Sequence, residues 1–396
     1  MGGAFQALGA WKAPPIARRK RGLAGSLSGE RIDTVSPMKR LAILGAVLAT
    51  ALTATPAHAA TALELPAPTG TQGVGTTSLH LVDTTRKDPL APTVRDRELM
   101  VRLWYPAQRR GPRAGYVSPT QSALLVGFLN DQLGTTLPDD LLTFPTHSRQ
   151  DARPLSRHPL LLFSPGLGVN AALYTGIFEE LASRGYVVAA VDHTFDAPFV
   201  EFPGGRIEPQ NPEALKDFDR LLAVRTADMR FVLTQLSTGP FSRNIDLSRV
   251  GVFGHSMGSI TAVRTMNADR RFHAGTALDG NPLGSASLDR PFLLLGNQNH
   301  RRVDDRDWAD FYDRLRGPRL HLVVQGALHY DFTDVTIFKS VVDVGKLFEV
   351  GPIDGERSLT IERRYVTAWF DKALRGKDNP LLCGESPRFR EVDFQP

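Results

Sequence analysis

Short apolar runs alternate with amphipathic stretches along the chain from Pro159 onward. Runs that are apolar throughout and alternate with helical periods are typical of a parallel sheet covered by helices on both faces, so we expect an α/β fold. The expected strands are 159–164, 186–191, 250–253, 274–279, 291–296 and 320–325, and the expected helices are 170–184, 212–237, one from 257, 305–315 and 359–374. Asn211 is the expected N-cap of the second helix, with Pro212 as its first residue.

The chain before the first of these strands is less regular. Two strand-like stretches, 76–82 and 99–105, flank a charged segment. The apolar stretch 121–133 has the length of a helix that either covers the core or forms part of a lid or of a patch that makes transient contact with a lipid interface. Residues 60–73 are small, aperiodic and rich in Pro and Gly, which predicts a flexible lead-in. We expect one catalytic domain over 74–396, ending in a C-terminal tail.

Residues 38–59 have the pattern of a secretory signal peptide. Two basic residues precede an apolar run, and the run ends at Ala57-His58-Ala59, an A-x-A cleavage pattern. The apolar run is short for a membrane span. We therefore expect a secreted protein that is cleaved near Ala59, and we interpret residues 1–37 as an over-extended start upstream of Met38.

Composition narrows the classes of function. The chain has 396 residues, 42% of them apolar, and a formal net charge of +5. Residues 1–59 hold eight of the 47 Lys and Arg and two of the 42 Asp and Glu, which leaves 39 basic and 40 acidic residues in the rest. This balance gives no support to nucleic-acid binding. The single cysteine, Cys383, cannot form an intrachain disulfide or a cysteine-based zinc site, and no His, Asp or Glu spacing predicts a metal site.

The clearest chemical signature is Gly254-His255-Ser256-Met257-Gly258, which fits G-x-S-x-G. It lies directly between an expected strand and an expected helix. In such an elbow the serine occupies a strained turn, and the flanking glycines let the helix pack against the strand. The hydroxyl is then exposed at the carboxyl edge of the sheet, beside a helix N-terminus that favours a developing oxyanion. Ser256 is therefore the predicted nucleophile.

A nucleophilic serine needs a base and an orienting acid, which follow in the order Ser, Asp, His in this class of turn. The histidines after Ser256 are His273, His300, His321 and His329. His273 and His321 lie at strand starts, on the opposite edge of the sheet. His329 follows the last apolar strand at the carboxyl edge and is the predicted base, with His300 as its rival.

The sequence pattern leaves the acid open. Asp279 ends the strand that follows the nucleophile helix, whereas Asp304 and Asp305 follow the next strand, which is the commoner position for the acid. An aspartate that ends a strand before a glycine is also an ordinary turn former.

The oxyanion hole needs two backbone N–H donors. Met257, directly after the nucleophile, supplies one, and Leu167 in the glycine-flanked turn after the 159–164 strand is the predicted second, since Pro165 has no N–H. His193 ends a strand at the same edge and either lines the pocket or is a hydrogen-bonded strand-end residue. Phe195 on the next loop either contacts an acyl chain or forms the local core of the loop.

Four blocks of the chain together resemble the plasma-type (group VII) platelet-activating-factor acetylhydrolases and their secreted bacterial lipase and esterase relatives. They are FSPGLGVNAALYTGIFEELASRGYVVAAVDH (163–193), the GHSMG elbow, ALDG (277–280) and GALHYDFTDVTIF (326–338). The resemblance covers residues 74–375 and implies an α/β-hydrolase fold. It also implies a calcium-independent esterase without a cofactor that acts on lipid esters, either short-acyl phospholipids or acylglycerols.

By this resemblance the catalytic triad is Ser256, Asp279 and His329, and Leu167 supplies an oxyanion N–H. The chain departs from the family pattern at Pro165, where a histidine is usual, and at Ser259, where the elbow usually has a second glycine. The departure at Pro165 puts the transfer of phospholipid specificity in doubt. A broad-specificity lipase, a cutinase-like polyester hydrolase and a non-catalytic binding protein of the same fold are the alternatives.

Overall fold

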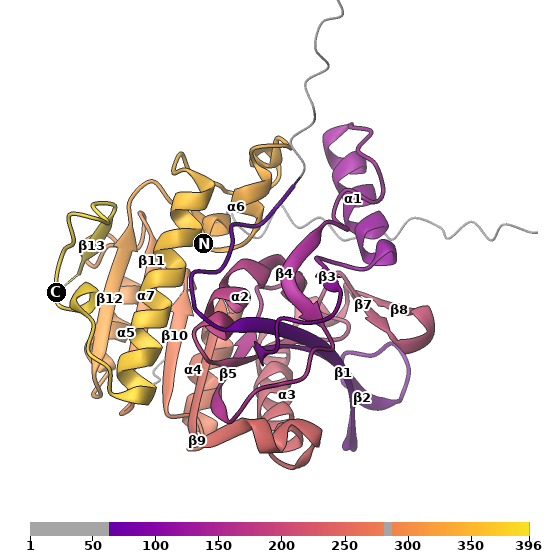
Figure 1. Cartoon of the computed structure of the whole chain (residues 1–396), viewed down its shortest axis with the longest axis horizontal. Coiled ribbons are helices and arrows are strands. Elements are labelled where there is room, and N and C mark those ends of the chain that lie inside the picture. Colours follow the sequence, from indigo (N-terminus) through magenta and orange to yellow (C-terminus); the bar gives the residue numbers. More distant parts are fainter. Residues whose placement is uncertain (1–62, 281–286, 396) are drawn as a thin grey trace, which may run out of the picture. The chain divides into compact units, whose positions relative to one another are not determined.

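An eleven-stranded sheet runs through the computed structural model, which describes residues 63–280 and 287–395 (Figure 1). The expectations for residues 1–37 and 38–59 lie outside these ranges. The strand order is β13-β12-β11-β10-β9-β5-β6-β2-β1-β4-β3, and β7 and β8 form a separate hairpin. The strands from β12 to β6 in this order are mutually parallel, while β2 and β13 pair antiparallel at their two sides. This arrangement confirms the expected α/β-hydrolase fold.

The strands are β1 (Gly73–Lys87), β2 (Asp96–Ala107), β3 (Arg113–Gly115), β4 (Pro145–Gln150), β5 (His158–Ser164), β6 (Val187–Asp192), β7 (Phe199–Phe202), β8 (Arg206–Pro209), β9 (Ile245–His255), β10 (Ala274–Leu278), β11 (Phe292–Asn297), β12 (Arg319–Val324) and β13 (Val392–Phe394). The helices are α1 (Pro119–Leu133), α2 (Thr175–Ser183), α3 (Phe218–Thr238), α4 (Met257–Ala268), α5 (Arg306–Arg314), α6 (Val335–Phe338) and α7 (Gly355–Arg375), with short 3-10 turns that include η3 (Ala214–Lys216), η4 (Pro240–Asn244) and η5 (His329–Phe332). Among the described residues, no helix is both long and apolar enough to cross a membrane.

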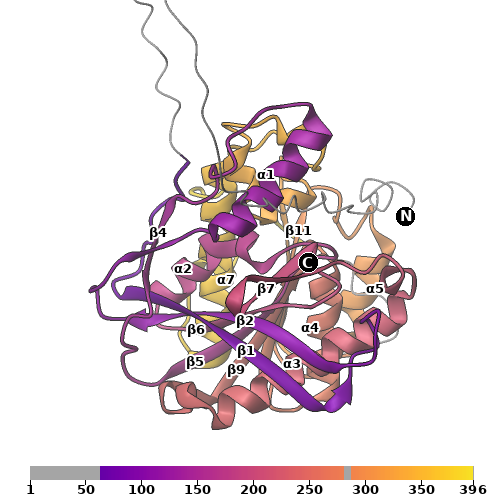
Figure 2. The ribbon, with the colours of Figure 1, turned by 90° about the vertical axis from the view of Figure 1, so that its right-hand side faces the viewer.

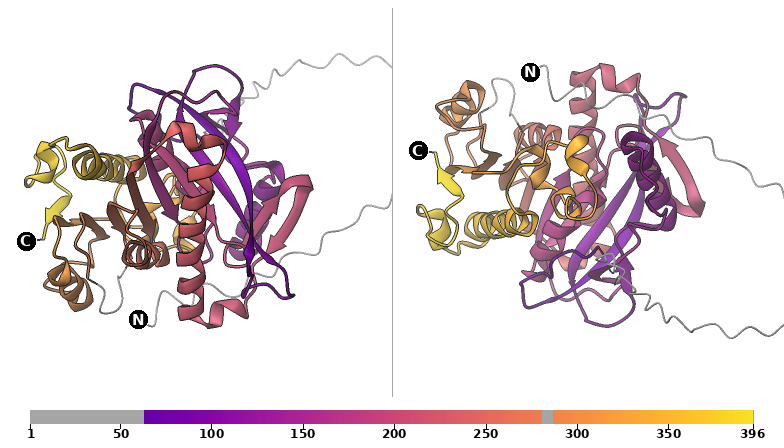
Figure 3. Two further views of the ribbon diagram at one scale, coloured as in Figure 1. Left: turned by 90° about the horizontal axis from the view of Figure 1, so that it is seen from below. Right: turned by 90° about the horizontal axis from the view of Figure 1, so that it is seen from above.

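Alternating side chains of the central strands build two cores, one on each face of the sheet. In β5, Leu161 and Phe163 pack with α2 and α7, whereas Leu160 and Leu162 pack with α3, α4 and α5. This is the side-chain alternation of a strand that is buried on both faces. Figure 3 shows the same two layers, with α7 and α3 on opposite sides of the strands.

The start of α3 differs from the sequence prediction, because tertiary contacts at Asn211 override its preference for an N-cap. The long helix expected from Pro212 begins at Phe218, where the side chain of Asp217 accepts a hydrogen bond from Arg220 N. The expected N-cap, Asn211, instead accepts a bond from Glu213 N and donates one to the carbonyl of Leu90, so it closes a turn. The N-cap prediction at Asn211 is therefore wrong.

The segment before β1 is anchored rather than flexible over its described part. The side chains of Leu63 and Leu65 are buried in a core that also contains residues of α1 and α6. Glu180 in α2 accepts bonds from the backbone and side chain of Thr69, each at 2.6 Å. Residues 63–72 thus belong to the folded domain. In Figure 2, α1 stands at the end of the molecule that this segment approaches.

Candidate active site

The elbow between β9 and α4 holds Ser256 in a strained backbone conformation with φ 57° and ψ −121°. An added Cβ at Gly254 would overlap the backbone of Gly258, and one at Gly258 would overlap the carbonyl oxygen of Ser164. Only glycine therefore allows this approach of α4 to β9 and β5. Ser259 fits because its hydroxyl donates to the carbonyl of Gly254 at 2.8 Å.

Three strand ends bring the candidate triad residues to one edge of the sheet, where β11 lies between β10 and β12 in the strand order. Ser256 follows β9, Asp279 follows β10, and His329 begins η5 after β12. The backbone N–H of Ser256 donates to Leu278 O at 2.9 Å, which ties the elbow to the strand that carries Asp279. His329 Nδ1 lies 2.6 Å from Asp279 Oδ2. Asp279 also accepts bonds from the backbone N–H of Asn297 at 2.6 Å and from its side-chain amide at 2.9 Å.

The electrostatics of this pair suit a base and its orienting acid. Burial opposes ionisation of Asp279, but its hydrogen bond with His329 and the nearby imidazoles outweigh burial and lower its pKa to about 2. Burial also opposes protonation of His329, but the hydrogen bond and charge of Asp279 raise the pKa of the imidazole above 6.5. Because Nδ1 donates to the carboxylate, Nε2 is the nitrogen that can accept a proton.

The turn after β5 offers backbone donors beside the elbow. In the described part of the chain, no residue accepts a hydrogen bond from the backbone N–H of Leu167 or Met257. Gly166 is close to the elbow, since an added Cβ there would lie 3.5 Å from Cβ of Ser256. Both expected oxyanion donors are therefore unused in this structure and belong to segments that meet at Ser256.

His255 links the elbow to the turn after β5 and to the segment that carries His329. Its Nδ1 lies 2.9 Å from the hydroxyl of Tyr174, which accepts a bond from Gly166 N, and its Nε2 lies 3.0 Å from the carbonyl of His329. Burial and the neighbouring His329 lower the pKa of His255 to about 3, so it is neutral. A neutral ring with the proton on Nε2 satisfies both contacts. Tyr174 and Asn297 could not be identified from the sequence pattern, because neither belongs to the elbow motif.

The rival base, His300, also approaches the acid. Its Nε2 lies 3.6 Å from Asp279 Oδ1, but its Nδ1 forms the shorter contact, 2.8 Å, with Asp305 Oδ2. The ring stacks on Trp308 with the centroids 4.4 Å apart. Asp305 in turn caps α5 by accepting from Trp308 N. His300 and Asp305 thus form a pair beside the candidate triad.

His193 and Phe195 do not line an exposed wall, because 1% and 2% of their surfaces are accessible. The two ring nitrogens of His193 contact the hydroxyl of Ser164 at 3.0 Å and the carboxylate of Asp228 at 2.9 Å. Phe195 packs in an apolar cluster with Met257 and partly buried Leu167. Each residue thus matches the second alternative given for it: His193 is a hydrogen-bonded residue at a strand end, and Phe195 belongs to the local apolar core.

Among the described residues, one group of three His, Cys, Asp or Glu side chains has the spacing of a metal site, and it is His255, Asp279 and His329. Hydrogen bonds already occupy His329 Nδ1 and both nitrogens of His255, so these three side chains fit an Asp279–His329 pair with a neutral His255 beside it better than a metal site.

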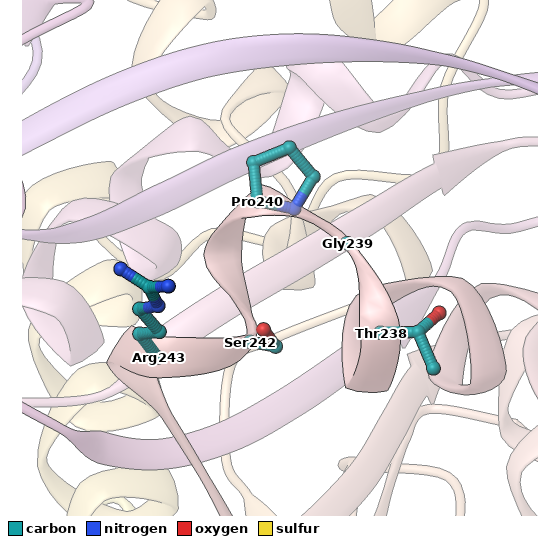
Figure 4. A pocket seen from close by; sticks show the side chains of 5 residues that line it. All are labelled: Thr238, Gly239, Pro240, Ser242 and Arg243. Carbon is teal, nitrogen blue, oxygen red and sulfur yellow. The ribbon is translucent and has the colours of Figure 1, made fainter.

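A surface hollow lies in the turn from α3 to β9, far along the strand from the elbow. Figure 4 shows its lining by Thr238, Gly239, Pro240, Ser242 and Arg243. This turn leads into the amino end of β9, whereas Ser256 follows its carboxyl end. The hollow is therefore separate from the candidate site.

Comparisons with known proteins identify the family of the chain. The sequence matches the family described as platelet-activating factor acetylhydrolase, isoform II, over residues 59–198 and 213–380. A probable 1-alkyl-2-acetylglycerophosphocholine esterase of Arthroderma benhamiae is 30% identical, over 83% of this chain and 93% of its own. The platelet-activating factor acetylhydrolase of Cavia porcellus is 26% identical, over 55% of this chain and 58% of its own.

A solved structure is also similar. The ferulic acid esterase of Streptomyces cinnamoneus superposes with a TM-score of 0.76 and 38% sequence identity, covering 85% of this chain and all of that chain. The family match and these relatives have hydrolysis of carboxylic esters in common. The chain therefore belongs to the isoform II platelet-activating factor acetylhydrolase family and is a hydrolase of carboxylic esters.

Proposed function

We propose that the protein cleaves esters through an acyl-enzyme on Ser256, with His329 as base, Asp279 as orienting acid, and the N–H groups of Leu167 and Met257 as the oxyanion hole. The observation that carries this proposal is the 2.6 Å hydrogen bond between His329 Nδ1 and Asp279 Oδ2, formed at the strand edge that also carries the strained elbow. The two unused N–H groups beside the elbow give it independent support.

The mechanism follows from these positions. His329 Nε2 removes the proton from Ser256 Oγ as the oxygen attacks the ester carbonyl carbon. Negative charge develops on the carbonyl oxygen, where backbone N–H donors stabilise it most strongly in the transition state. The imidazolium, stabilised by ionised Asp279, then protonates the departing alkoxide, and an alcohol leaves. Water repeats the sequence on the acyl-enzyme and releases the carboxylic acid.

For the substrate we propose lipid esters with a short acyl chain, such as an acetylated glycerophospholipid. The family match over most of the chain and the Arthroderma relative support this class. Pro165, in the turn that carries Leu167, is the reason to test headgroup recognition separately, because it departs from the usual family pattern at the mouth of the site.

A second candidate is the hydrolysis of hydroxycinnamate esters. The observation that favours it is the 38% identity with the Streptomyces ferulic acid esterase, which exceeds the 30% identity with the Arthroderma relative over a similar share of the chain. The two candidates share the triad and differ in the acyl group that must fit beside Ser256.

A single panel of substrates separates these candidates. Purified enzyme is assayed with p-nitrophenyl esters from acetate to palmitate, with a 2-acetyl glycerophospholipid and with methyl ferulate, alongside Ser256→Ala. A preference for acetyl esters including the phospholipid supports the first candidate, and a preference for methyl ferulate supports the second. A rate that rises with chain length would instead indicate a lipase. Turnover that survives in folded Ser256→Ala would contradict the mechanism.

We also propose that the protein is secreted and processed near Ala59. The basic, apolar and A-x-A segments of residues 38–59 support this proposal. Expression of the full chain in a secreting bacterium, followed by N-terminal sequencing of the extracellular form, tests it. A first residue at or near Ala60 is expected, and retention of the uncleaved chain in the cells would contradict the proposal.

A further inference from the structure

A buried ion pair lies directly behind the turn that carries Leu167. Arg225 of α3 and Asp196 of the loop after β6 have accessible side-chain fractions of 1% and 0%. Arg225 Nε donates to Asp196 Oδ2 and Nη2 donates to Oδ1, each at 2.6 Å. This two-bond geometry fixes the plane of the guanidinium group. Burial opposes ionisation of Asp196, but the charge and hydrogen bonds of Arg225 outweigh burial and lower its pKa.

The rest of the guanidinium holds the turn itself. Nη1 donates to the carbonyl of Pro165 at 2.6 Å and to Ser164 Oγ at 3.3 Å, while Nη2 donates to the carbonyl of Gly166 at 3.1 Å. The partner carboxylate of Asp196 accepts a bond from Gly168 N at 3.4 Å. The ion pair therefore contacts the turn on both sides of Leu167 but leaves the N–H of Leu167 free.

The contact with Gly166 sets the direction of that N–H. The carbonyl of Gly166 and the N–H of Leu167 belong to the same peptide unit, which is planar, and in a trans peptide the two groups point in opposite directions. A guanidinium that binds the Gly166 oxygen from behind therefore turns the Leu167 N–H away from itself. A hydrogen bond to the carbonyl oxygen also polarises the peptide and strengthens its N–H as a donor.

We propose that Arg225, held by Asp196, is a positioning residue that preorganises the Leu167 half of the oxyanion hole. The proposal rests on the proposed function, because it assigns a task to residues that support Ser256 chemistry. Arg225 contacts neither substrate nor the reacting atoms; it acts through the peptide unit between Gly166 and Leu167.

The test compares Arg225→Lys with a matched control, Arg97→Lys. Arg97 is also fully buried and pairs with Asp88 and Asp228, but its remaining bond goes to the carbonyl of Thr194 rather than to the turn. Lysine keeps the charge at either site but cannot bind a carboxylate and two carbonyls in one plane. We expect Arg225→Lys to lower kcat on p-nitrophenyl acetate by roughly 10²-fold, the cost of one oxyanion donor, with KM within about threefold. Arg97→Lys should keep kcat within about threefold.

A second readout separates positioning from general loosening of the fold. A trifluoromethyl ketone adds to the serine as an oxyanion, whereas the matching secondary alcohol binds without one. In Arg225→Lys the ketone should bind more weakly by the same factor as kcat/KM falls, and the alcohol should bind as in the wild type. Asp196→Asn, which keeps an acceptor for Arg225, should show smaller losses of kcat/KM and of ketone affinity. It replaces Arg225→Lys in the test if the arginine variant does not fold.

The two proposals fail in different ways. Wild-type enzyme without Ser256-dependent turnover would overturn the proposed function. Active wild type with a folded Arg225→Lys or Asp196→Asn variant of unchanged kcat and ketone affinity would overturn the positioning role alone. An equal loss of kcat in Arg97→Lys would also overturn it, because the effect would then follow from buried charge in general.

Discussion

Replacing Asp279 by asparagine tests the acid of the triad, which the sequence pattern leaves open. Asp279 Oδ1 accepts from the backbone N–H of Asn297, while Oδ2 accepts from the side-chain amide of Asn297 and from His329 Nδ1. An asparagine at this position has one oxygen. If that oxygen accepts from the backbone N–H of Asn297, the NH2 group of the new asparagine faces two donors, the side-chain amide of Asn297 and the Nδ1–H of His329. His329 must then lose the proton on Nδ1.

The imidazole then carries its proton on Nε2, the atom that has to accept the proton of Ser256. The wrong tautomer, together with loss of the stabilising charge, predicts a fall in kcat of about 10⁴-fold by analogy with serine hydrolases in general. That factor corresponds to about 5 kcal/mol of lost transition-state stabilisation at 1.36 kcal/mol per decade.

The assay is kcat/KM for p-nitrophenyl acetate, with the melting temperature measured on the same samples to confirm folding. The matched control is Asp305→Asn, whose one oxygen can still cap α5 by accepting from Trp308 N, while its NH2 group can donate to His300 Nδ1 in the other tautomer of that ring. Retention of more than a tenth of the activity by Asp279→Asn, beside an inactive Asp305→Asn, would exclude Asp279 as the acid and assign that role to Asp305.

Three further outcomes follow from the same geometry. Activity should rise with pH through the pKa of His329, which Asp279 raises, so half-maximal kcat/KM is expected above pH 6.5; a plateau already reached at pH 6 would contradict this. His300→Gln should keep activity within about tenfold because the ring is bound to Asp305, and a loss as large as that of His329→Gln would make His300 the base. Burial raises the pKa of Asp334 from 3.8 to about 7, so the folded state binds the extra proton and wild-type stability should fall between about pH 4 and 7. The denaturant midpoint of Asp334→Asn minus that of the wild type should therefore increase from pH 5 to pH 8. A difference that does not change with pH would count against a raised pKa of Asp334.

The strand β9, the elbow at Ser256 and the place of His329 could be predicted from the sequence because each depends on a short local pattern. The run 250–253 and the glycines around Ser256 locate β9 and the elbow, since only a strand that turns directly into a helix needs that pattern. The position of His329 follows from the rule that parallel strands end at one edge. In contrast, Asp279 and Asp305 both follow strands at that edge, and strand ends alone do not distinguish them.

The contacts that the sequence could not predict are those between distant segments. Arg225 reads as one of several charges on an amphipathic helix, and only the packing of α3 behind the turn brings it to Pro165 and Gly166. The segment before β1 has the composition of a linker. Its carbonyls at Pro66 and Ala67 nevertheless accept bonds from Arg363, almost 300 positions later in the chain.

Covalent labelling establishes whether Ser256 is the nucleophile. The wild type and Ser256→Ala are incubated with an alkyl fluorophosphonate, which loses fluoride as a serine oxygen bonds to phosphorus, and peptide mass spectrometry then locates the adduct. We predict one adduct per chain, on Ser256, with activity lost in proportion to labelling and no adduct in the variant. Full inactivation with Ser256 unmodified, or equal labelling of the variant at another residue, would assign the nucleophile to a different side chain.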